Sequence, residues 1–322
     1  MMNRMALYFI SVIFSIVRRS LVFSGPFALA ALAQTTITIP SSIDGAGQKA
    51  LLWIPPGKAA APLLVHLHSW SATYDKSSEI EVALEAAKQR GWIFLSPDFR
   101  GPNQRPEACA SKLAIQDVLD AVAGVRSKHK VDGKRIYLLG GSGGGHMALM
   151  MAAKAPKLWT AVSAWVPISD LTAWHEFSAG KKAPYAGMIE KCCGGAPGPA
   201  TAAEYRARSP LFFLEAAKGL PIDIQTGIRD GHEGSVPVSH ALNAFNKLAE
   251  ANGQPGRKVS AADIEYMVRE AKIPAALAGE RADEPGRKKG ILFRRTAGKA
   301  RITVFDGGHE ADFAAAAAWF AK

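Results

Sequence analysis

A single serine lies inside a run of glycines, and a serine in a glycine-rich turn is typical of enzymes that use its hydroxyl as a nucleophile in acyl transfer. The run Gly140-Gly141-Ser142-Gly143-Gly144-Gly145 follows an apolar stretch and precedes a helix-forming one, so we expect a strand, a tight turn and a helix. A serine at the tip of such a turn has a strained backbone, and glycine neighbours fit beside it because they lack a Cβ atom. We therefore predict that Ser142 is the nucleophile of a serine hydrolase.

Two other uses of a glycine-rich turn fit the sequence less well. A phosphate-binding loop ends in Lys followed by Ser or Thr, whereas His146 and Met147 follow this run. A dinucleotide-binding glycine turn belongs to the first strand–helix unit of its domain, whereas this run lies in the middle of the chain. We therefore expect no cofactor.

A serine hydroxyl needs a histidine base, and the histidine needs a carboxylate that sets its tautomer. In hydrolases with a strand–serine–helix turn, the chain order is serine, acid, histidine, with the last two on loops after later strands. Asp230 and His309 each follow an apolar, strand-like run in this order. We predict Asp230 as the acid and His309 as the base. Glu233 is the competing acid, and His232 is expected to line the pocket.

The oxyanion of a tetrahedral intermediate needs two backbone N–H donors, one of them from the residue after the serine. We predict the N–H groups of Gly143 and Trp70 as these donors. Further aromatic residues, Tyr74, Trp165 and Trp174, are expected to contact substrate, and packing in the core is the competing interpretation. The pair His66 and His68 lacks an evident third ligand, so we expect no metal site.

Strands and helices alternate along most of the chain, which predicts one α/β domain over residues 34–322. Two strands, 35–40 and 49–54, are expected to form a hairpin that leads into a mostly parallel, eight-stranded sheet with helices on both faces. Regular periodicity lapses between residues 169 and 209, where we expect a lid over the active site. Residues 254–300 interrupt the alternation and are interpreted as an insertion that holds a short helix, 261–271, and a strand, 291–295.

The first 33 residues have the pattern of an export signal, in which arginines precede an apolar stretch and a small-residue cleavage site. We expect a secreted or periplasmic protein. The pair Arg18-Arg19 leaves both the general and the twin-arginine export routes open. The stretch after the arginines is shorter than the roughly 20 apolar residues of a membrane span, which argues against an uncleaved anchor. For an exported chain, the cysteines favour a disulfide from Cys109 to one of the vicinal pair Cys192-Cys193. A vicinal bridge and three free thiols are the alternatives.

The formal net charge is +11, from 39 Lys and Arg against 28 Asp and Glu. Residues 254–301 hold twelve Lys and Arg against six Asp and Glu, a net of +6, so the basic excess is concentrated in the insertion. A solvated helical face is the favoured interpretation, and a polyanion-binding patch is the alternative. Motifs for nucleic-acid recognition do not occur.

Several motifs resemble the prolyl oligopeptidase-type branch of the α/β-hydrolases, including its small acetylxylan and feruloyl esterase-like members. The resemblance extends over residues 63–320 and is carried by the glycine run and by Asp98-Phe99-Arg100-Gly101, residues 115–121, 131–136 and 166–171, Asp230 with Val236-Pro237, and Gly307-Gly308-His309. It implies the same Ser142, Asp230 and His309 triad. The sequence departs from the family in its basic insertion and in Ser69 and Trp70, where glycines are usual. Only roughly 30 residues separate Gln34 from the apolar run that begins at Leu63, and this is too few for the family's β-propeller.

The leading functional hypothesis is an exported serine hydrolase that cleaves carboxylic esters through an acyl-enzyme, with acetyl or feruloyl esters of polysaccharides as candidate substrates. The first alternative is a peptidase of the same mechanism that acts on short peptides. The second is a non-catalytic binding protein on a hydrolase scaffold, which an intact triad argues against. The expected partner is a small-molecule or polysaccharide substrate, without nucleic acid or a stable membrane anchor.

Overall fold

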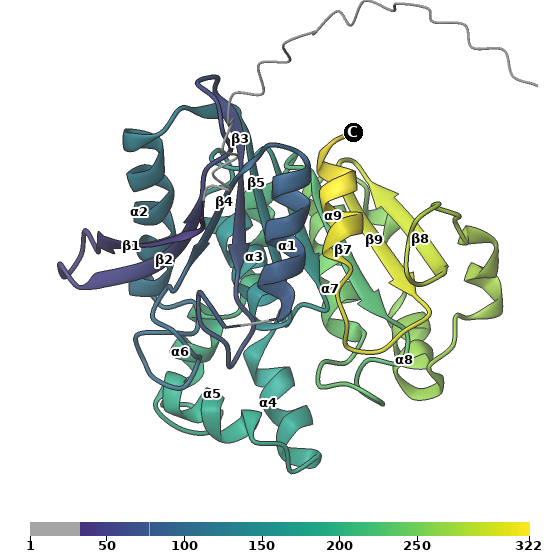
Figure 1. Ribbon diagram of the computed structural model, residues 1–322. Coiled ribbons are helices and arrows are strands. Elements are labelled where there is room, and N and C mark those ends of the chain that lie inside the picture. Colours follow the sequence, from purple (N-terminus) through teal and green to yellow (C-terminus); the bar gives the residue numbers. More distant parts are fainter. Residues whose placement is uncertain (1–32, 77) are drawn as a thin grey trace, which may run out of the picture. The chain divides into compact units, whose positions relative to one another are not determined.

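The computed structural model describes residues 33–76 and 78–322, so the predicted export signal lies outside the described residues except for Ala33. Within them, nine strands form one mixed sheet in the order β1-β2-β4-β3-β5-β6-β7-β9-β8 (Figure 1). The strands are β1 (Thr35–Pro40), β2 (Gly47–Trp53), β3 (Ala61–Leu67), β4 (Ile93–Pro97), β5 (Val131–Gly141), β6 (Ala161–Trp165), β7 (Ile222–Gly227), β8 (Ile291–Ala297) and β9 (Ala300–Phe305).

The α/β-hydrolase fold class is confirmed, with one strand more than predicted. The central strands pair in parallel, whereas β1 with β2, β2 with β4, and β8 with β9 pair antiparallel. The additional strand is β8, which the sequence indicated as a strand but not as part of the sheet. Buried side chains of β8 alternate with more exposed ones, as is typical of an edge strand that buries one face.

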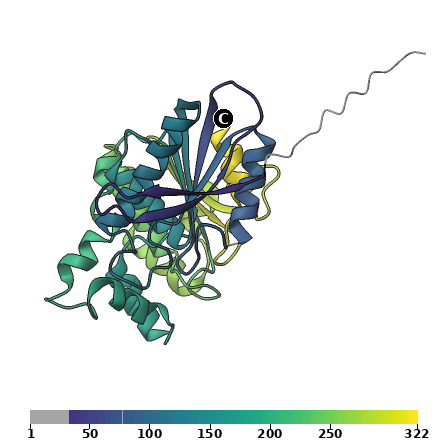
Figure 2. The same ribbon diagram turned by 60° about the vertical axis from the view of Figure 1, so that its left-hand side comes forward.

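Helices cover both faces of the sheet and also extend from one end of it (Figures 1 and 2). Their bounds are α1 (Ser78–Gln89), α2 (Lys112–Lys128), α3 (Gly143–Lys154), α4 (Leu171–Gly180), α5 (Tyr185–Cys193), α6 (Ala202–Ala207), α7 (Ser239–Ala251), α8 (Ala261–Glu270) and α9 (Phe313–Phe320), with short 3₁₀ turns η1 (Pro210–Phe212), η2 (Leu214–Ala217), η3 (Pro255–Arg257) and η4 (Ala275–Glu280). None of the described helices has the length and apolar character needed to cross a membrane.

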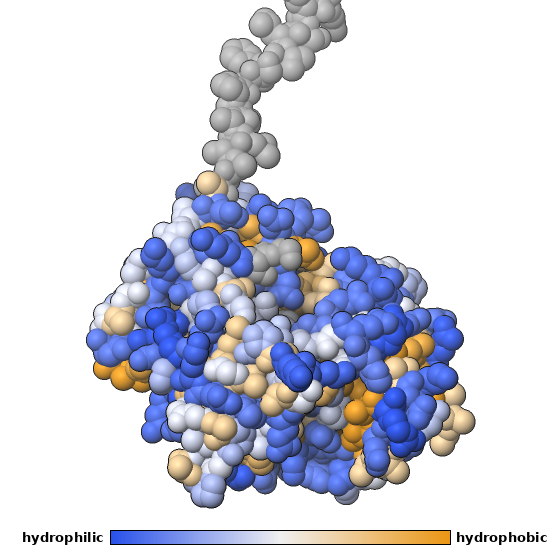
Figure 3. Space-filling view, turned by 90° about the horizontal axis from the view of Figure 1, so that it is seen from below, coloured by the Kyte–Doolittle hydropathy of each residue, from blue (hydrophilic) through white to orange (hydrophobic). Residues whose placement is uncertain are grey.

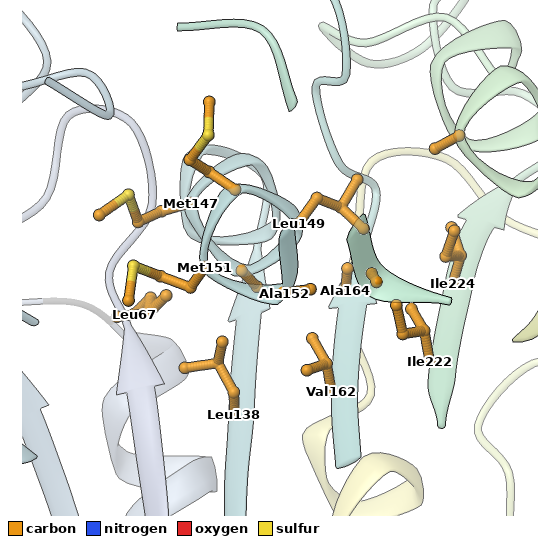
Figure 4. Packing of buried hydrophobic residues seen from close by; sticks show 14 of the residues in the cluster. Leu67, Leu138, Met147, Leu149, Met151, Ala152, Val162, Ala164, Ile222 and Ile224 are labelled. Carbon is orange, nitrogen blue, oxygen red and sulfur yellow. The ribbon is translucent and has the colours of Figure 1, made fainter. Parts of the chain in front are cut away.

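The two faces of the sheet carry separate hydrophobic clusters. Leu63, Val65 and Leu67 of β3 point to the cluster covered by α2, α3, α7 and α8, whereas Leu64 points to the cluster under α1 and α9. Figure 4 shows Met147, Met151 and other apolar side chains of α3 packed on the central strands of the first cluster. Because β3 is buried on both faces, it reads as a continuous apolar run in the sequence.

Residues 169–209, predicted as an irregular lid, form the three helices α4, α5 and α6 beyond the end of β6. These helices are short, and glycines and prolines separate them. For example, Pro184 precedes α5, and Gly194, with φ 85°, ends it in a left-handed conformation. Such short helices contain too few turns for a clear apolar periodicity, so the sequence pattern did not reveal them. Seen from the side of these helices, polar residues and apolar patches are mixed over the surface (Figure 3).

The predicted disulfide is wrong, because Cys109, Cys192 and Cys193 are all free. All three thiols are buried in the hydrophobic cluster that joins α4, α5 and α6 to the rest of the domain. Burial raises the pKa of the Cys109 thiol, which keeps it protonated and unreactive. The cysteines therefore pack as small apolar side chains.

The insertion, residues 254–300, contributes α8, which packs near α7, and β8 at the edge of the sheet. Part of its positive charge is neutralised within the domain. The guanidinium of Arg294 lies 2.8 Å from Glu284, Arg295 pairs with Glu280, and Arg301, just beyond the insertion, lies 2.7 Å from Asp223. These arginines are thus used inside the fold. Glu280 and Glu284 are already subtracted in the net of +6, so only the pair of Arg301 with Asp223 lowers that net charge further.

Candidate active site

The backbone at Ser142 turns sharply between β5 and α3. Its φ and ψ are 55° and −118°, a conformation that non-glycine residues rarely adopt. The Ser142 N–H donates to the Trp165 carbonyl at 2.9 Å, and this bond anchors the turn to β6. A Cβ atom on Gly144 would lie 2.0 Å from the Leu67 carbonyl oxygen, so only glycine fits there. The serine is therefore held in a strained and fixed position at the end of the strand.

Three side chains from distant parts of the chain form one hydrogen-bonded line. His309 Nε2 lies 2.9 Å from Ser142 Oγ, and His309 Nδ1 lies 2.7 Å from Asp230 Oδ2. A carboxylate only accepts hydrogen bonds, so Nδ1 carries the proton and Nε2 can accept the serine proton. This is the geometry that a serine nucleophile, its base and its acid require.

The carboxyl group of Asp230 is buried and held by backbone donors. Its Oδ1 accepts hydrogen bonds from the N–H groups of Gly231 and Val236, each at 3.0 Å. A Cβ atom on Gly234 would lie 2.4 Å from both Asp230 Oδ1 and His309 Cβ, so the loop after β7 wraps closely around this pair. The bond to His309 uses the other carboxylate oxygen. Glu233, the competing acid, instead pairs with Arg229 at 2.9 Å.

The loop that carries His309 is tied to the loop that carries Asp230. The Arg229 N–H donates to the Gly307 carbonyl at 2.9 Å, and the Arg229 side chain reaches Asp306 at 2.5 Å. A Cβ atom on Gly227 would lie 2.2 Å from the Gly308 carbonyl oxygen, so the two loops are in direct backbone contact. The relative position of acid and histidine is thus set by main-chain packing.

The two predicted oxyanion donors lie against each other. A Cβ atom on Gly143 would lie 2.4 Å from Trp70 N and 2.5 Å from Trp70 Cα. The Trp70 carbonyl accepts from the Asn103 N–H at 2.9 Å, which fixes the orientation of this loop. The Trp70 N–H itself donates to no group within the described part of the chain, as an oxyanion donor must.

The residues predicted to contact substrate are largely buried. Trp165 and Trp174 are each 1% exposed and Trp70 is 2% exposed, so they leave little ring surface for a sugar or aryl group. Tyr74 is also buried. His232 is exposed, but its Nε2 is bonded to the Val268 carbonyl at 2.6 Å, which connects the acid loop to α8. The structure therefore supports the packing interpretation of the aromatic residues.

Sequence reasoning missed one charged group beside the turn at Ser142. This group is Glu79 in the first turn of α1. A Cβ atom on Gly141 would lie 2.8 Å from Glu79 Oε1, so this carboxyl group packs against the backbone directly before Ser142, the predicted nucleophile. Burial raises the pKa of Glu79, and the charge of nearby His309 acts in the opposite direction. The signal was an acidic residue at the start of the helix that follows the oxyanion loop.

The other histidines singled out in the sequence lie in the interior. His66 stacks on Phe94, and burial lowers the pKa of its imidazole to about 3. The two ring nitrogens of His68 contact the carbonyl oxygens of Ser69 and Asp98 at 3.0 and 2.8 Å. In the part of the chain that the structure describes, no cluster of His, Cys, Asp and Glu could hold a metal ion.

Residues 78–263 match the sequence profile of the prolyl oligopeptidase family. No curated protein sequence matches the chain significantly. Among solved structures, the acylaminoacyl peptidase of Pyrococcus horikoshii is similar, with a TM-score of 0.55, 20% identity and 70% of this chain covered. A puromycin-hydrolysing peptidase of Mycobacterium tuberculosis gives a TM-score of 0.54 and 17% identity over 74% of this chain. Oligopeptidase B from Leishmania major gives a TM-score of 0.59 and 13% identity over 92% of this chain.

These structural likenesses show the fold. The chain matches 36% of the acylaminoacyl peptidase, 38% of the puromycin-hydrolysing peptidase and 36% of oligopeptidase B, so it spans little more than a third of their lengths.

Proposed function

The chain belongs to the prolyl oligopeptidase family and is a serine hydrolase, and from this premise we propose that it cleaves short peptides through an acyl-enzyme formed on Ser142. The observation that carries the proposal is the line of hydrogen bonds from Ser142 through His309 to Asp230, at 2.9 and 2.7 Å. These distances are within the range that proton transfer between a nucleophile and its base requires.

In the proposed mechanism, Ser142 Oγ attacks the carbonyl carbon of the substrate while His309 Nε2 takes the hydroxyl proton. The negative charge that develops on the carbonyl oxygen is stabilised by the N–H groups of Gly143 and Trp70. His309 then donates its proton to the leaving group, and a water molecule, activated by the same imidazole, hydrolyses the acyl-enzyme. Asp230 stabilises the imidazolium throughout and stays ionised.

The choice of peptides over esters is supported by the family and by the similar structures, which are named as peptidases. Carboxylic esters are the second candidate substrate, because the same nucleophile and donors suit both carbonyl groups. Acetyl and feruloyl esters of polysaccharides are less well supported as substrates, because the rings of Trp165 and Trp174, which were expected to contact them, are buried.

The test compares the wild-type protein with Ser142→Ala on an N-acetylated aminoacyl p-nitroanilide, p-nitrophenyl acetate, acetylated xylan and methyl ferulate. We expect anilide hydrolysis by the wild type and its loss in the variant, with an unchanged circular dichroism spectrum. Ester turnover without anilide turnover would favour the second candidate. Full activity of Ser142→Ala would overturn the mechanism, and wild-type inactivity on all four substrates would favour a binding protein.

We also propose that the protein is exported, on the grounds of the arginines, the apolar stretch and the small residues in its first 33 positions. The measurement is the N-terminal sequence of the protein recovered from its native host. A mature chain that begins near Gln34, outside the cytoplasm, is expected. A chain with its first residues intact would contradict export by cleavage.

A further inference from the structure

Trp174 of α4 connects the two halves of the candidate active site. Its indole Nε1–H donates to the Ser235 carbonyl oxygen at 2.7 Å, in the loop that carries Asp230. Its ring meets the ring of Trp70 edge to face, with a centroid distance of 4.6 Å and an interplanar angle of 75°. One buried side chain therefore contacts both the acid loop and the residue whose backbone N–H is the proposed oxyanion donor.

The bond to Ser235 acts on Asp230 through a single peptide group. The Ser235 carbonyl and the Val236 N–H belong to the same planar unit, and the Val236 N–H donates to Asp230 Oδ1 at 3.0 Å. The hydrogen bonds consequently run in series from Trp174 through this peptide to Asp230, His309 and Ser142. Hydrogen bonds in series polarise one another, and a fixed carbonyl also fixes the direction of the N–H on the same peptide.

The position of Trp174 is itself well determined. Asp170 caps α4, since its Oδ1 accepts from the Thr172 N–H at 2.9 Å. The Leu171 N–H donates to Ser209 Oγ at 2.8 Å, which ties the start of the helix to the segment after α6. Tyr185 of α5 also packs against the Trp174 ring, at 5.0 Å between centroids. Helices α4 and α5 thus hold the indole rigidly between the two loops.

We propose that Trp174 is a positioning residue for catalysis, which orients the Ser235–Val236 peptide toward Asp230 and supports the loop of Trp70. The proposal rests on the proposed function, because it needs Ser142 to be a reactive nucleophile. It differs from the sequence-based expectation that Trp174 contacts substrate. A substrate contact would act mainly on KM, whereas a positioning residue acts mainly on kcat.

The test is Trp174→Phe, which keeps a ring beside Trp70 but removes the N–H donor. The matched control is Trp159→Phe. Trp159 is also buried, and its Nε1–H donates to the Met151 carbonyl at 3.1 Å, in the core behind α3. Both variants lose one indole N–H bond to a backbone carbonyl, so a general effect on stability will be similar in the two.

We expect Trp174→Phe to lower kcat by about 10-fold with KM changed by less than about 2-fold, as for the loss of one well-placed hydrogen bond. Trp159→Phe is expected to keep the wild-type kcat. The rate at which a fluorophosphonate labels Ser142 provides a second measurement that does not depend on the identity of the substrate. In Trp174→Phe this labelling rate should fall by a factor similar to that for kcat. Replacing Trp174 by 3-benzothienylalanine, which keeps the ring shape and lacks the N–H, should reproduce the loss.

Equal kcat values in the two variants would overturn the inference and leave the proposed function intact. A raised KM with an unchanged kcat in Trp174→Phe would also overturn it, in favour of a substrate contact. A wild-type protein that neither turns over any substrate nor reacts with the fluorophosphonate would overturn the proposed function itself, and the inference with it.

Discussion

His309 Nε2 lies 2.9 Å from Ser142 Oγ, although 167 positions separate the two residues along the chain. Replacing His309 by Gln keeps a polar side chain of similar length but removes the base. We expect kcat to fall by about 10⁴-fold, because the serine hydroxyl then has no proton acceptor. The melting temperature should change little, since the His309 side chain is on the rim of the fold at 21% exposure. Burst kinetics with p-nitrophenyl acetate and a thermal melt measure both, and a kcat within 10-fold of wild type would exclude His309 as the base.

The close approach of Gly143 to Trp70 predicts a specific effect of one methyl group. In Gly143→Ala the new Cβ would lie 2.4 Å from Trp70 N, so the oxyanion loop has to move. We expect kcat to fall by about 100-fold or more, as when an oxyanion donor is lost. The control is Gly187→Ala in α5, where nothing lies within 4 Å of the added atom. The control should retain wild-type kinetics and gain about 0.5–1 kcal/mol of stability from its helix position. Similar kinetics in the two variants would show that the contact is unimportant.

Arg100 forms ion pairs with a buried and a more exposed carboxylate. Its guanidinium lies 2.5 Å from Asp117, whose side chain is fully buried, and 2.8 Å from Asp44 at the hairpin turn. Asp117→Asn leaves a largely buried positive charge undercompensated, so we expect it to lower the free energy of unfolding by about 3 kcal/mol. Asp44→Asn should lower the free energy of unfolding by less, because water can replace the carboxylate of the more exposed Asp44 beside Arg100. Urea denaturation at pH 7 tests this order of effects, and the reverse order would contradict it.

Buried histidines predict that the protein loses stability in mild acid. Burial lowers the pKa of His146 and of His240 to about 4, whereas both titrate near 6.5 in the unfolded chain. Between these values the unfolded chain binds protons that the folded one does not, so the free energy of unfolding falls as the pH decreases from 6.5 to 4. Over this whole pH range each histidine lowers the free energy of unfolding by about 3 kcal/mol.

Urea midpoints between pH 7 and pH 4.5 measure this slope. In His240→Asn, the amide oxygen can still accept the Ser169 N–H bond, which is 3.2 Å long in the wild type, but the side chain does not titrate. This variant should therefore show a shallower loss of stability. A pH dependence identical to that of the wild type would exclude His240 as a source of the effect.

Local patterns in the sequence determined the order of the elements and their approximate bounds. Alternating apolar runs predicted the βα units. The strand predicted at residues 35–40 has these bounds in the structure, and the helix predicted at residues 261–271 ends one residue earlier. Glycines around Ser142 predicted the strand–turn–helix because their steric requirement is local. Each of these features depends on residues close together in the chain, which is why a single sequence contains them.

Contacts between distant segments were decided only by the tertiary structure. The antiparallel addition of β8 to the sheet, the burial of Trp165 and Trp174, the free state of the thiols and the position of Glu79 behind Gly141 all depend on which surfaces pack together. The same holds for the bond from Trp174 to the Ser235 carbonyl, which crosses 61 positions of the chain. The sequence alone predicted which residues would do the chemistry. The distances between these residues and their exposure to solvent depend on the packing of the whole domain, and a local sequence pattern encodes neither.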